Sequence, residues 1–111
     1  MIMFLPSRQL HSFCIRGFQY WDGALVLEKL KAGDGLELRI EADNPHDPSA
    51  VAIYKGSSKL GYVPAEINES LFLMLFYGHK AAFEVRVLQV NREAEPWKQV
   101  RAGIYVADNR E

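Results

Sequence analysis

Two prolines placed three residues apart constrain this chain most strongly, in the steps Asn44-Pro45 and Asp47-Pro48. Proline fixes its own φ angle and keeps the residue before it out of the α region, so a helix cannot run through this segment. Asn44 and Asp47 have short side chains that can accept hydrogen bonds from nearby backbone N–H groups and brace a turn. Residues 41–51 are therefore predicted to form a rigid loop between two strands.

Alternating apolar and polar residues predict six strands, because successive side chains of a strand point to opposite faces. The alternation is clearest where Leu36, Leu38 and Ile40 share one face. Two further runs flank a turn that contains Gly56, and they predict a hairpin. The predicted strands cover residues 11–17, 36–41, 50–54, 59–63, 82–91 and 100–106.

Two helices of unequal length are predicted between these strands. Asp22 is a suitable N-cap for a short helix over residues 23–31. A longer helix over residues 65–77 follows Pro64 and ends at Gly78, which is a sound pair of start and stop signals. The residues of the short helix predicted to face inward are Leu25, Val26 and Leu30, with Leu27 as a further candidate.

The order of these elements favours a small closed or nearly closed β-barrel over a parallel α/β sheet. The chain has 111 residues, of which 49% are hydrophobic, and this is typical of one soluble globular domain. We expect the domain to span residues 11–107. Residues 1–10 are expected to be a tail or an added edge segment, and residues 108–111 a C-terminal tail.

Bulk composition narrows the possible functions. A formal net charge of −1 gives no overall basic field, so nucleic-acid binding would need a local patch. The single cysteine, Cys14, rules out an internal disulfide and a multi-thiolate zinc site, and we expect it to be buried and inert. The apolar run before Pro6 is too short for a signal sequence or a membrane span, so the expected location is cytoplasmic.

The sequence carries no recognisable catalytic motif. The glycines at 33 and 35 lack the lysine and the strand–loop–helix setting of a phosphate loop. Asp43, His46 and Asp47 are close enough to suggest a metal site or a nuclease, but turn residues of this kind usually bond to backbone, and no cysteine supports them. No metal, no cofactor and no enzymatic activity are expected.

An adjacent aromatic pair, Tyr20-Trp21, follows the first predicted strand and is expected to face the loop that carries His46 and Asp47. Exposed rings offer stacking surfaces worth about 1–3 kcal/mol per nucleic-acid base. Two interpretations stay open: the rings bind a ligand, or they cover the core while Asp47 only braces its turn. Scattered cations that could contact phosphates are Arg16, Arg39, Lys55 and Lys59.

The predicted helix over residues 65–77 is apolar nearly all round. Such a helix is either buried on two sides within its own domain or offers a surface to a protein partner or a second copy. One face carries Ile67, Leu71, Met74 and Leu75. The opposite face, which would form a homodimer or partner surface, carries Phe72, Leu73 and Phe76.

Three motifs together resemble the HIRAN domain family, which occurs at the N-terminus of SWI/SNF-type DNA-repair ATPases and as free-standing bacterial proteins. The motifs are GFQYWDG at 17–23, EADNPHDPSAV at 41–51 and LGYVP at 60–64. The pairing of N-P-x-D-x-x-A-V with a later G-Y-V-P is specific, and the resemblance covers residues 13–106. It implies a modified OB-like β-barrel of six strands with two helices.

The resemblance also implies binding of single-stranded DNA, at a free 3′-hydroxyl end, in DNA repair or replication. Tyr20 and Trp21 match two aromatic residues that stack on the terminal bases. Asp47 matches an aspartate that bonds the terminal 3′-hydroxyl. A carboxylate accepts a hydrogen bond from a hydroxyl but repels a phosphate, so it would prefer a strand end to a continuing strand.

The chain departs from the DNA-binding pattern of the family at three positions. Gln19 stands in place of a basic residue, Tyr62 in place of a histidine and Ala65 in place of a lysine. The resemblance therefore implies weaker binding or a shifted ligand. Binding would depend strongly on salt if the remaining Arg16 and Lys59 carry it, with Tyr62 lining the same groove.

Overall fold

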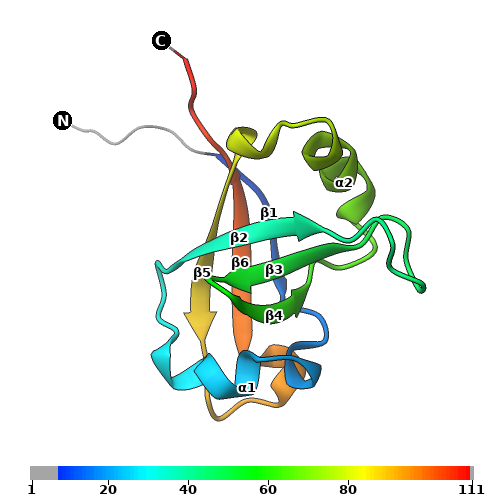
Figure 1. The fold of residues 1–111 in the computed structure, drawn as a ribbon. Helices are drawn as coiled ribbons and strands as arrows, with labels where there is room; N and C mark the ends of the chain where they lie inside the picture. Colours follow the sequence, from blue (N-terminus) through cyan, green and yellow to red (C-terminus); the bar gives the residue numbers. More distant parts are fainter. Residues whose placement is uncertain (1–7, 111) are drawn as a thin grey trace, which may run out of the picture.

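The computed structural model describes residues 8–110, which form a six-stranded antiparallel sheet in the order β1-β6-β5-β2-β3-β4 (Figure 1). The mainly β class is therefore confirmed. The strands are β1 (Arg8–Cys14), β2 (Gly35–Ile40), β3 (Val51–Lys55), β4 (Ser58–Tyr62), β5 (Phe83–Val90) and β6 (Val100–Val106).

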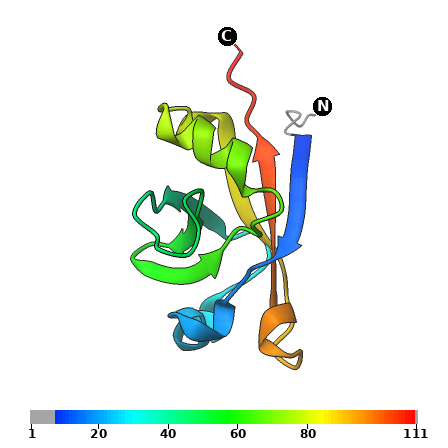
Figure 2. The same ribbon diagram turned by 90° about the vertical axis from the view of Figure 1, so that its right-hand side faces the viewer.

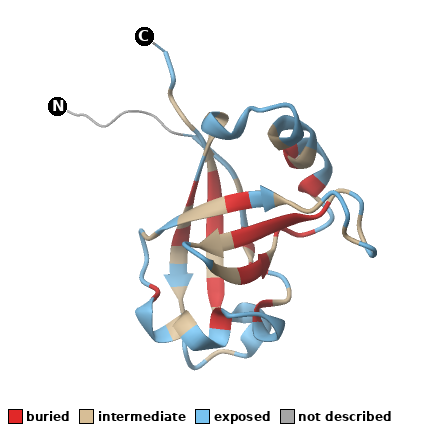
Figure 3. Ribbon diagram, viewed as in Figure 1, coloured by how far each residue is buried: buried red, intermediate tan, exposed pale blue. Residues whose placement is uncertain are grey.

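The sheet bends into two layers that cross each other. The antiparallel strands β1, β6 and β5 share one axis, and β2, β3 and β4 cross it (Figures 1 and 2). Apolar side chains from both layers fill the space between them, and the most buried parts of β3 and β6 mark this core (Figure 3). Fully buried core residues include Ile15, Phe18, Leu30, Val51, Ile53, Leu60, Val87 and Ile104.

A closed barrel is not confirmed, because β1 and β4 are the two edges of the sheet. Within residues 8–110 the edges meet at one isolated bridge, where Arg16 and Tyr62 exchange two backbone hydrogen bonds of 3.0 and 2.9 Å. The approach is close enough to require glycine at position 61. Gly61 has a φ of 149°, and a Cβ there would collide with the Arg16 carbonyl and the Ile15 side chain.

The first strand lies further towards the N-terminus than predicted. It begins at Arg8 and ends at Cys14, because Arg16 pairs with Tyr62 of β4, although Ile15 N still donates to Val100 O of β6 at 3.0 Å. Residues 8–10, expected as a tail or edge segment, are thus part of the edge strand, while residues 1–7 and 111 lie outside the described part. Cys14 is half-buried, which corrects the expectation that it is buried.

The short helix differs from its prediction in both length and facing. α1 (Gly23–Val26) is followed by a 3₁₀ turn (Leu27–Lys29). Gly23 packs against the Phe18 ring, so Leu25, two residues further on, turns outward and is 80% exposed. Leu25 was wrongly predicted to face inward. Val26 is half-buried and Leu30 buried, in agreement with the prediction.

The long helix, α2 (Asn68–Phe76), covers one end of the crossed layers opposite α1 (Figure 2). It starts later than predicted because residues 65–67 form a turn, closed by a hydrogen bond from Ile67 N to Pro64 O. Only Leu71 among its apolar side chains is fully buried, so burial on two sides is wrong. Phe72 and Leu75 are half-buried, whereas Leu73, Met74 and Phe76 are exposed. No helix within residues 8–110 has the length and apolar character to cross a membrane.

Candidate functional site

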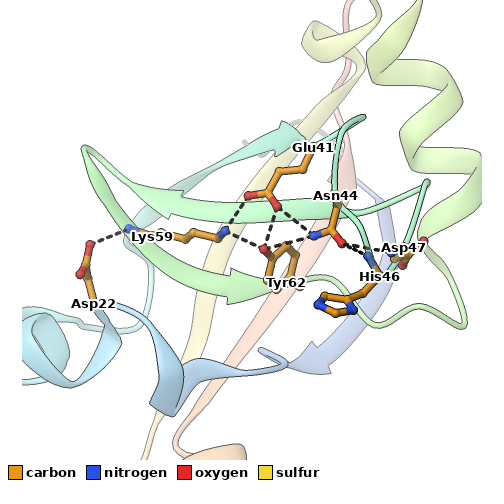
Figure 4. A network of polar contacts seen from close by, with 7 residues as sticks. All are labelled: Asp22, Glu41, Asn44, His46, Asp47, Lys59 and Tyr62. Carbon is orange, nitrogen blue, oxygen red and sulfur yellow. Dashed lines mark hydrogen bonds and ion pairs between the residues drawn. The ribbon is translucent and has the colours of Figure 1, made fainter.

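The proline-containing loop between β2 and β3 is braced from within, as its sequence predicts (Figure 4). The Asn44 side-chain oxygen accepts hydrogen bonds from the backbone N–H groups of His46 and Asp47, at 2.8 and 3.0 Å. Asp47 Oδ1 accepts another from the Ser49 N–H at 2.9 Å. These bonds replace the ladder contacts that the prolines prevent, and they fix where the Asp47 carboxylate lies.

Asn68, which the sequence reasoning missed, holds the second oxygen of Asp47. Its Nδ2 donates to Asp47 Oδ2 at 2.8 Å, and the Asn68 side chain is buried at the start of α2. Little in the sequence signalled this role, because Asn68 is the first of three polar residues, with Glu69 and Ser70, that begin the helix. Each carboxylate oxygen has two lone pairs, so Asp47 keeps the capacity to accept a further hydrogen bond from a ligand.

A second polar network joins the end of β2 to β4 (Figure 4). Lys59 Nζ lies 2.6 Å from Glu41 Oε2 and 2.6 Å from the Tyr62 hydroxyl. That hydroxyl donates to Glu41 Oε1 at 2.7 Å. Asn44 Nδ2 donates to the same Glu41 oxygen at 3.1 Å, so this network and the braced loop share one residue.

The charges of this network support one another. Burial raises the pKa of Glu41, but hydrogen bonds from Lys59, Tyr62 and Asn44 outweigh it, and the pKa lies below its usual value of 4.5. Burial lowers the pKa of Lys59, but its contacts with the Glu41 carboxylate and the Tyr62 hydroxyl together outweigh this, so the pKa is raised. Burial and Glu41 together raise the pKa of Tyr62. At neutral pH the network is a Glu41–Lys59 ion pair with a protonated tyrosine.

Trp21 rests on this network. Its ring lies 3.7 Å from Lys59 Nζ and meets the Tyr62 ring edge-on, with centroids 6.0 Å apart. The backbone beside it is also fixed to β4: Asp22 N donates to Lys59 O at 2.9 Å, and Asp22 Oδ2 accepts from Lys59 N at 3.3 Å. Asp22 therefore anchors the loop to β4. The prediction that its side chain caps α1 is wrong, because it makes no hydrogen bond to the start of that helix.

The aromatic pair does not cover the core. The neighbouring ring of Phe18 fills the interior, whereas Tyr20 is 76% exposed and Trp21 is 43% exposed. The two exposed rings differ in how firmly they are held: Trp21 has contacts with Lys59 and Tyr62, and Tyr20 projects further from the surface.

A pocket of about 330 Å³ opens between the aromatic loop, the proline-containing loop and the start of α2. Of the predicted site residues, it brings together Arg16, Trp21, His46, Asp47 and Tyr62. Gln19, Tyr20 and Lys59 do not line it. Its lining is Arg16, Trp21, Asn44, His46, Asp47, Ala50, Tyr62, Val63, Ala65 and Asn68. A larger hollow, of about 580 Å³ between the start of β1 and the end of β6, contains none of the predicted site residues.

Neither expected phosphate-binding cation stands unpaired. Lys59 is held by Glu41 with its side chain only 13% exposed. Arg16 lines the pocket and forms an exposed ion pair of 2.9 Å with Glu66. An exposed pair of this kind is weak, about 0–1 kcal/mol, so Arg16 can exchange Glu66 for another anion, whereas Lys59 is held by several contacts.

No group of three or more histidine, cysteine, aspartate or glutamate side chains in the described part of the chain is arranged to hold a metal ion. Asp43 and His46 are exposed on the loop, and the Asp47 oxygens are engaged by Ser49 and Asn68. The geometry therefore does not support the hypothesis that these three residues form a nuclease site.

The fold and the pocket define a small, mainly β binding domain. The chain belongs to the HIRAN domain family, whose model matches residues 9–107. HIRAN is a nucleic-acid-binding domain rather than a catalytic one. The fold is similar to the crystal structure of a protein from Lactobacillus plantarum, with a TM-score of 0.75 and 18% identity over 91% of this chain and 95% of that chain. No curated protein gives a significant match.

The Glu41–Lys59 network predicts a specific dependence of stability on pH. Because the folded pKa of Glu41 is lowered, its stabilisation is present above the unfolded value of 4.5 and is lost as pH falls through the folded pKa. Glu41→Gln should lower the free energy of unfolding at pH 7 by about 1–3 kcal/mol, and this difference should shrink below pH 4.5. Urea unfolding across pH measures both.

The matched control is Glu93→Gln, a change of the same charge at an exposed loop position. It should alter the free energy of unfolding by less than about 0.5 kcal/mol. A Glu41→Gln difference that stays constant down to pH 3 would contradict the ionic role of Glu41.

Proposed function

We propose that this chain is a non-catalytic module that binds single-stranded DNA, with a free 3′-hydroxyl end in its pocket, in DNA repair or replication. Membership of a nucleic-acid-binding family supports the ligand class. The observation that carries the proposal is that an exposed indole and a carboxylate line the same pocket of about 330 Å³. Trp21 supplies the indole and Asp47 the carboxylate.

Stacking supplies most of the affinity in this proposal. The exposed face of Trp21 takes one base, and the more exposed Tyr20 takes the next. Every base has a π-face, so this contact tolerates any sequence. Because Trp21 is already held against Lys59 and Tyr62, little of its side-chain freedom remains to be lost on binding.

Asp47 supplies the preference for an end. Ser49 and Asn68 fix its carboxylate at the pocket wall, and a terminal hydroxyl can donate to a remaining lone pair. A phosphate at the same place would bring a second negative charge against the carboxylate. A strand that ends in a hydroxyl is therefore favoured over one that continues or ends in phosphate.

Few charges are available for the sugar-phosphate backbone. Arg16 is the only arginine or lysine among the described residues that line the pocket. His46, which lines the pocket, and Gln19, which does not, are both exposed and offer hydrogen bonds without a permanent positive charge. The proposal therefore expects contact with one or two phosphates and a shallower salt dependence than the sequence alone suggested.

Removing either stacking ring should weaken binding. Trp21→Ala and Tyr20→Ala should each reduce the affinity for a short single strand by about 1–3 kcal/mol. Fluorescence anisotropy of a labelled oligonucleotide at low salt measures this, and circular dichroism checks that each variant is folded. Tyr77→Ala is the matched control, since Tyr77 is an equally exposed aromatic at the far end of α2. If affinity falls equally in the Tyr77 variant, the binding is unspecific.

A free 3′-hydroxyl should bind more tightly than a 3′-phosphate. The expected ratio is about ten-fold, because one hydrogen bond to a charged acceptor is lost and one repulsion is gained. Asp47→Asn should reduce the ratio towards one, while Asp43→Asn, on the same loop but outside the pocket, should leave it unchanged. Equal affinity for both ends in the wild type would contradict the end-reading role of Asp47.

The exposed face of α2 favours a second candidate function, as a protein-interaction or self-association module. Phe72 stacks on Phe76 with centroids 6.0 Å apart, and Phe76 meets Tyr77 edge-on at 5.1 Å. Leu73 and Phe76 are 53% and 54% exposed. A cluster of apolar rings facing solvent is a feature of surfaces that another molecule covers.

Light scattering after size exclusion tests self-association through this surface. If two copies pair through it, the wild type is a dimer and Phe76→Glu is a monomer, because burying a carboxylate at the interface is costly. Leu25→Glu is the matched control, since Leu25 is an exposed apolar side chain on α1 at the other end of the molecule. A monomeric wild type would contradict self-association.

A further inference from the structure

Lys59 is a cation beside the proposed DNA site, yet its surroundings differ from those of a lysine that binds phosphate. An ammonium group has three donors and no acceptor. One donor faces Glu41 at 2.6 Å and one faces the Tyr62 hydroxyl at 2.6 Å. The third direction is taken by the Trp21 ring, 3.7 Å away. No donor is left to bind a phosphate oxygen.

The burial of the Lys59 side chain also argues against contact with a phosphate. The Lys59 side chain is 13% exposed and lies beneath Trp21, away from the pocket lining. A phosphate could reach it only by displacing both the Glu41 carboxylate and the indole. The ion pair with Glu41 also cancels most of its field at a distance.

Lys59 holds the aromatic loop at two levels. Its backbone N–H and C=O bond to the side chain and the N–H of Asp22, the residue next to Trp21. Its ammonium attracts the face of the Trp21 ring, and such a contact is strengthened when the cation is partly desolvated. The Tyr62 ring also contacts the indole, in an edge-on arrangement.

We infer that Lys59 is a positioning residue that holds Trp21 in a stacking-ready orientation, and that it does not contact phosphate. This inference rests on the proposed function for its consequence on DNA binding, but the state of the indole can be measured without DNA. For DNA binding, the inference means that Lys59 affects how strongly Trp21 stacks on a base. Arg16 alone, of these two cations, then affects how the affinity depends on salt.

The test compares Lys59→Met, which keeps an unbranched apolar stem but removes the ammonium group, with Arg16→Gln. Lys59→Met should weaken binding of a short single strand by about 3- to 10-fold at every salt concentration. The slope of log Kd against log salt should stay at the wild-type value. Arg16→Gln should reduce that slope by about 0.7, the value for one phosphate contact on a single strand. A slope that falls in Lys59→Met as it does in Arg16→Gln would overturn the inference.

The second readout is acrylamide quenching of Trp21 fluorescence in a Trp97→Phe background, where Trp21 is the only tryptophan. Lys59→Met should raise the quenching constant by up to about two-fold, because a held ring that is 43% exposed becomes free. Lys59→Arg should restore the wild-type value, since a guanidinium can both pair with Glu41 and stack on the indole. Unchanged quenching in Lys59→Met would overturn the inference whatever happens to DNA binding.

Two controls keep the outcomes separate. Lys55→Met removes an equal charge from the same hairpin but from a different ion pair, the one with Asp34, and it should change neither readout. If Lys59→Met does not fold, Glu41→Gln is the second variant, because it keeps the lysine but removes its anchor and should raise Trp21 quenching in the same way. If the wild type binds no strand, the proposed function fails, and quenching alone decides the role of Lys59.

Discussion

The ion pair between Glu41 and Lys59 is the interaction on which the site depends most. It joins Glu41, the first residue of the proline-containing loop, to the edge strand β4 (Figure 4). One end of the pair reaches Asn44 and through it the loop that carries Asp47. The other end supports Trp21. The two halves of the pocket, which lie far apart in the sequence, are thus fixed relative to each other by one mostly buried pair of charges.

The pocket offers an exposed indole and hydrogen-bonding side chains but little positive charge. Many nucleic-acid-binding sites gain affinity from contacts with phosphates. Such contacts make binding sensitive to salt and add little selectivity. Here Lys59 forms an ion pair with Glu41, and Arg16 forms one with Glu66. In the proposed function, selectivity for a strand end would rest on Asp47, whose position is set by Ser49 and Asn68.

Local patterns in the sequence predicted the fold well, because alternation, prolines and glycines act over a few residues. All six strands and the braced turn of Asn44 and Asp47 followed from such signals. Contacts between distant residues did not: the Asn68–Asp47 bond and the Lys59–Trp21 contact each join separate elements. The outward turn of Leu25 and the single bridge between Arg16 and Tyr62, in place of a closed barrel, depend on the three-dimensional arrangement in the same way.

The most direct test follows the two indole N–H signals of ¹⁵N-labelled protein while a short strand with a free 3′-hydroxyl is added. The protein has two tryptophans, Trp21 in the pocket and Trp97 outside it, so each spectrum contains its own control. The account predicts that the Trp21 indole signal shifts and that the Trp97 signal stays in place. Equal shifts of both, or a shift of Trp97 alone, would contradict a DNA site at this pocket.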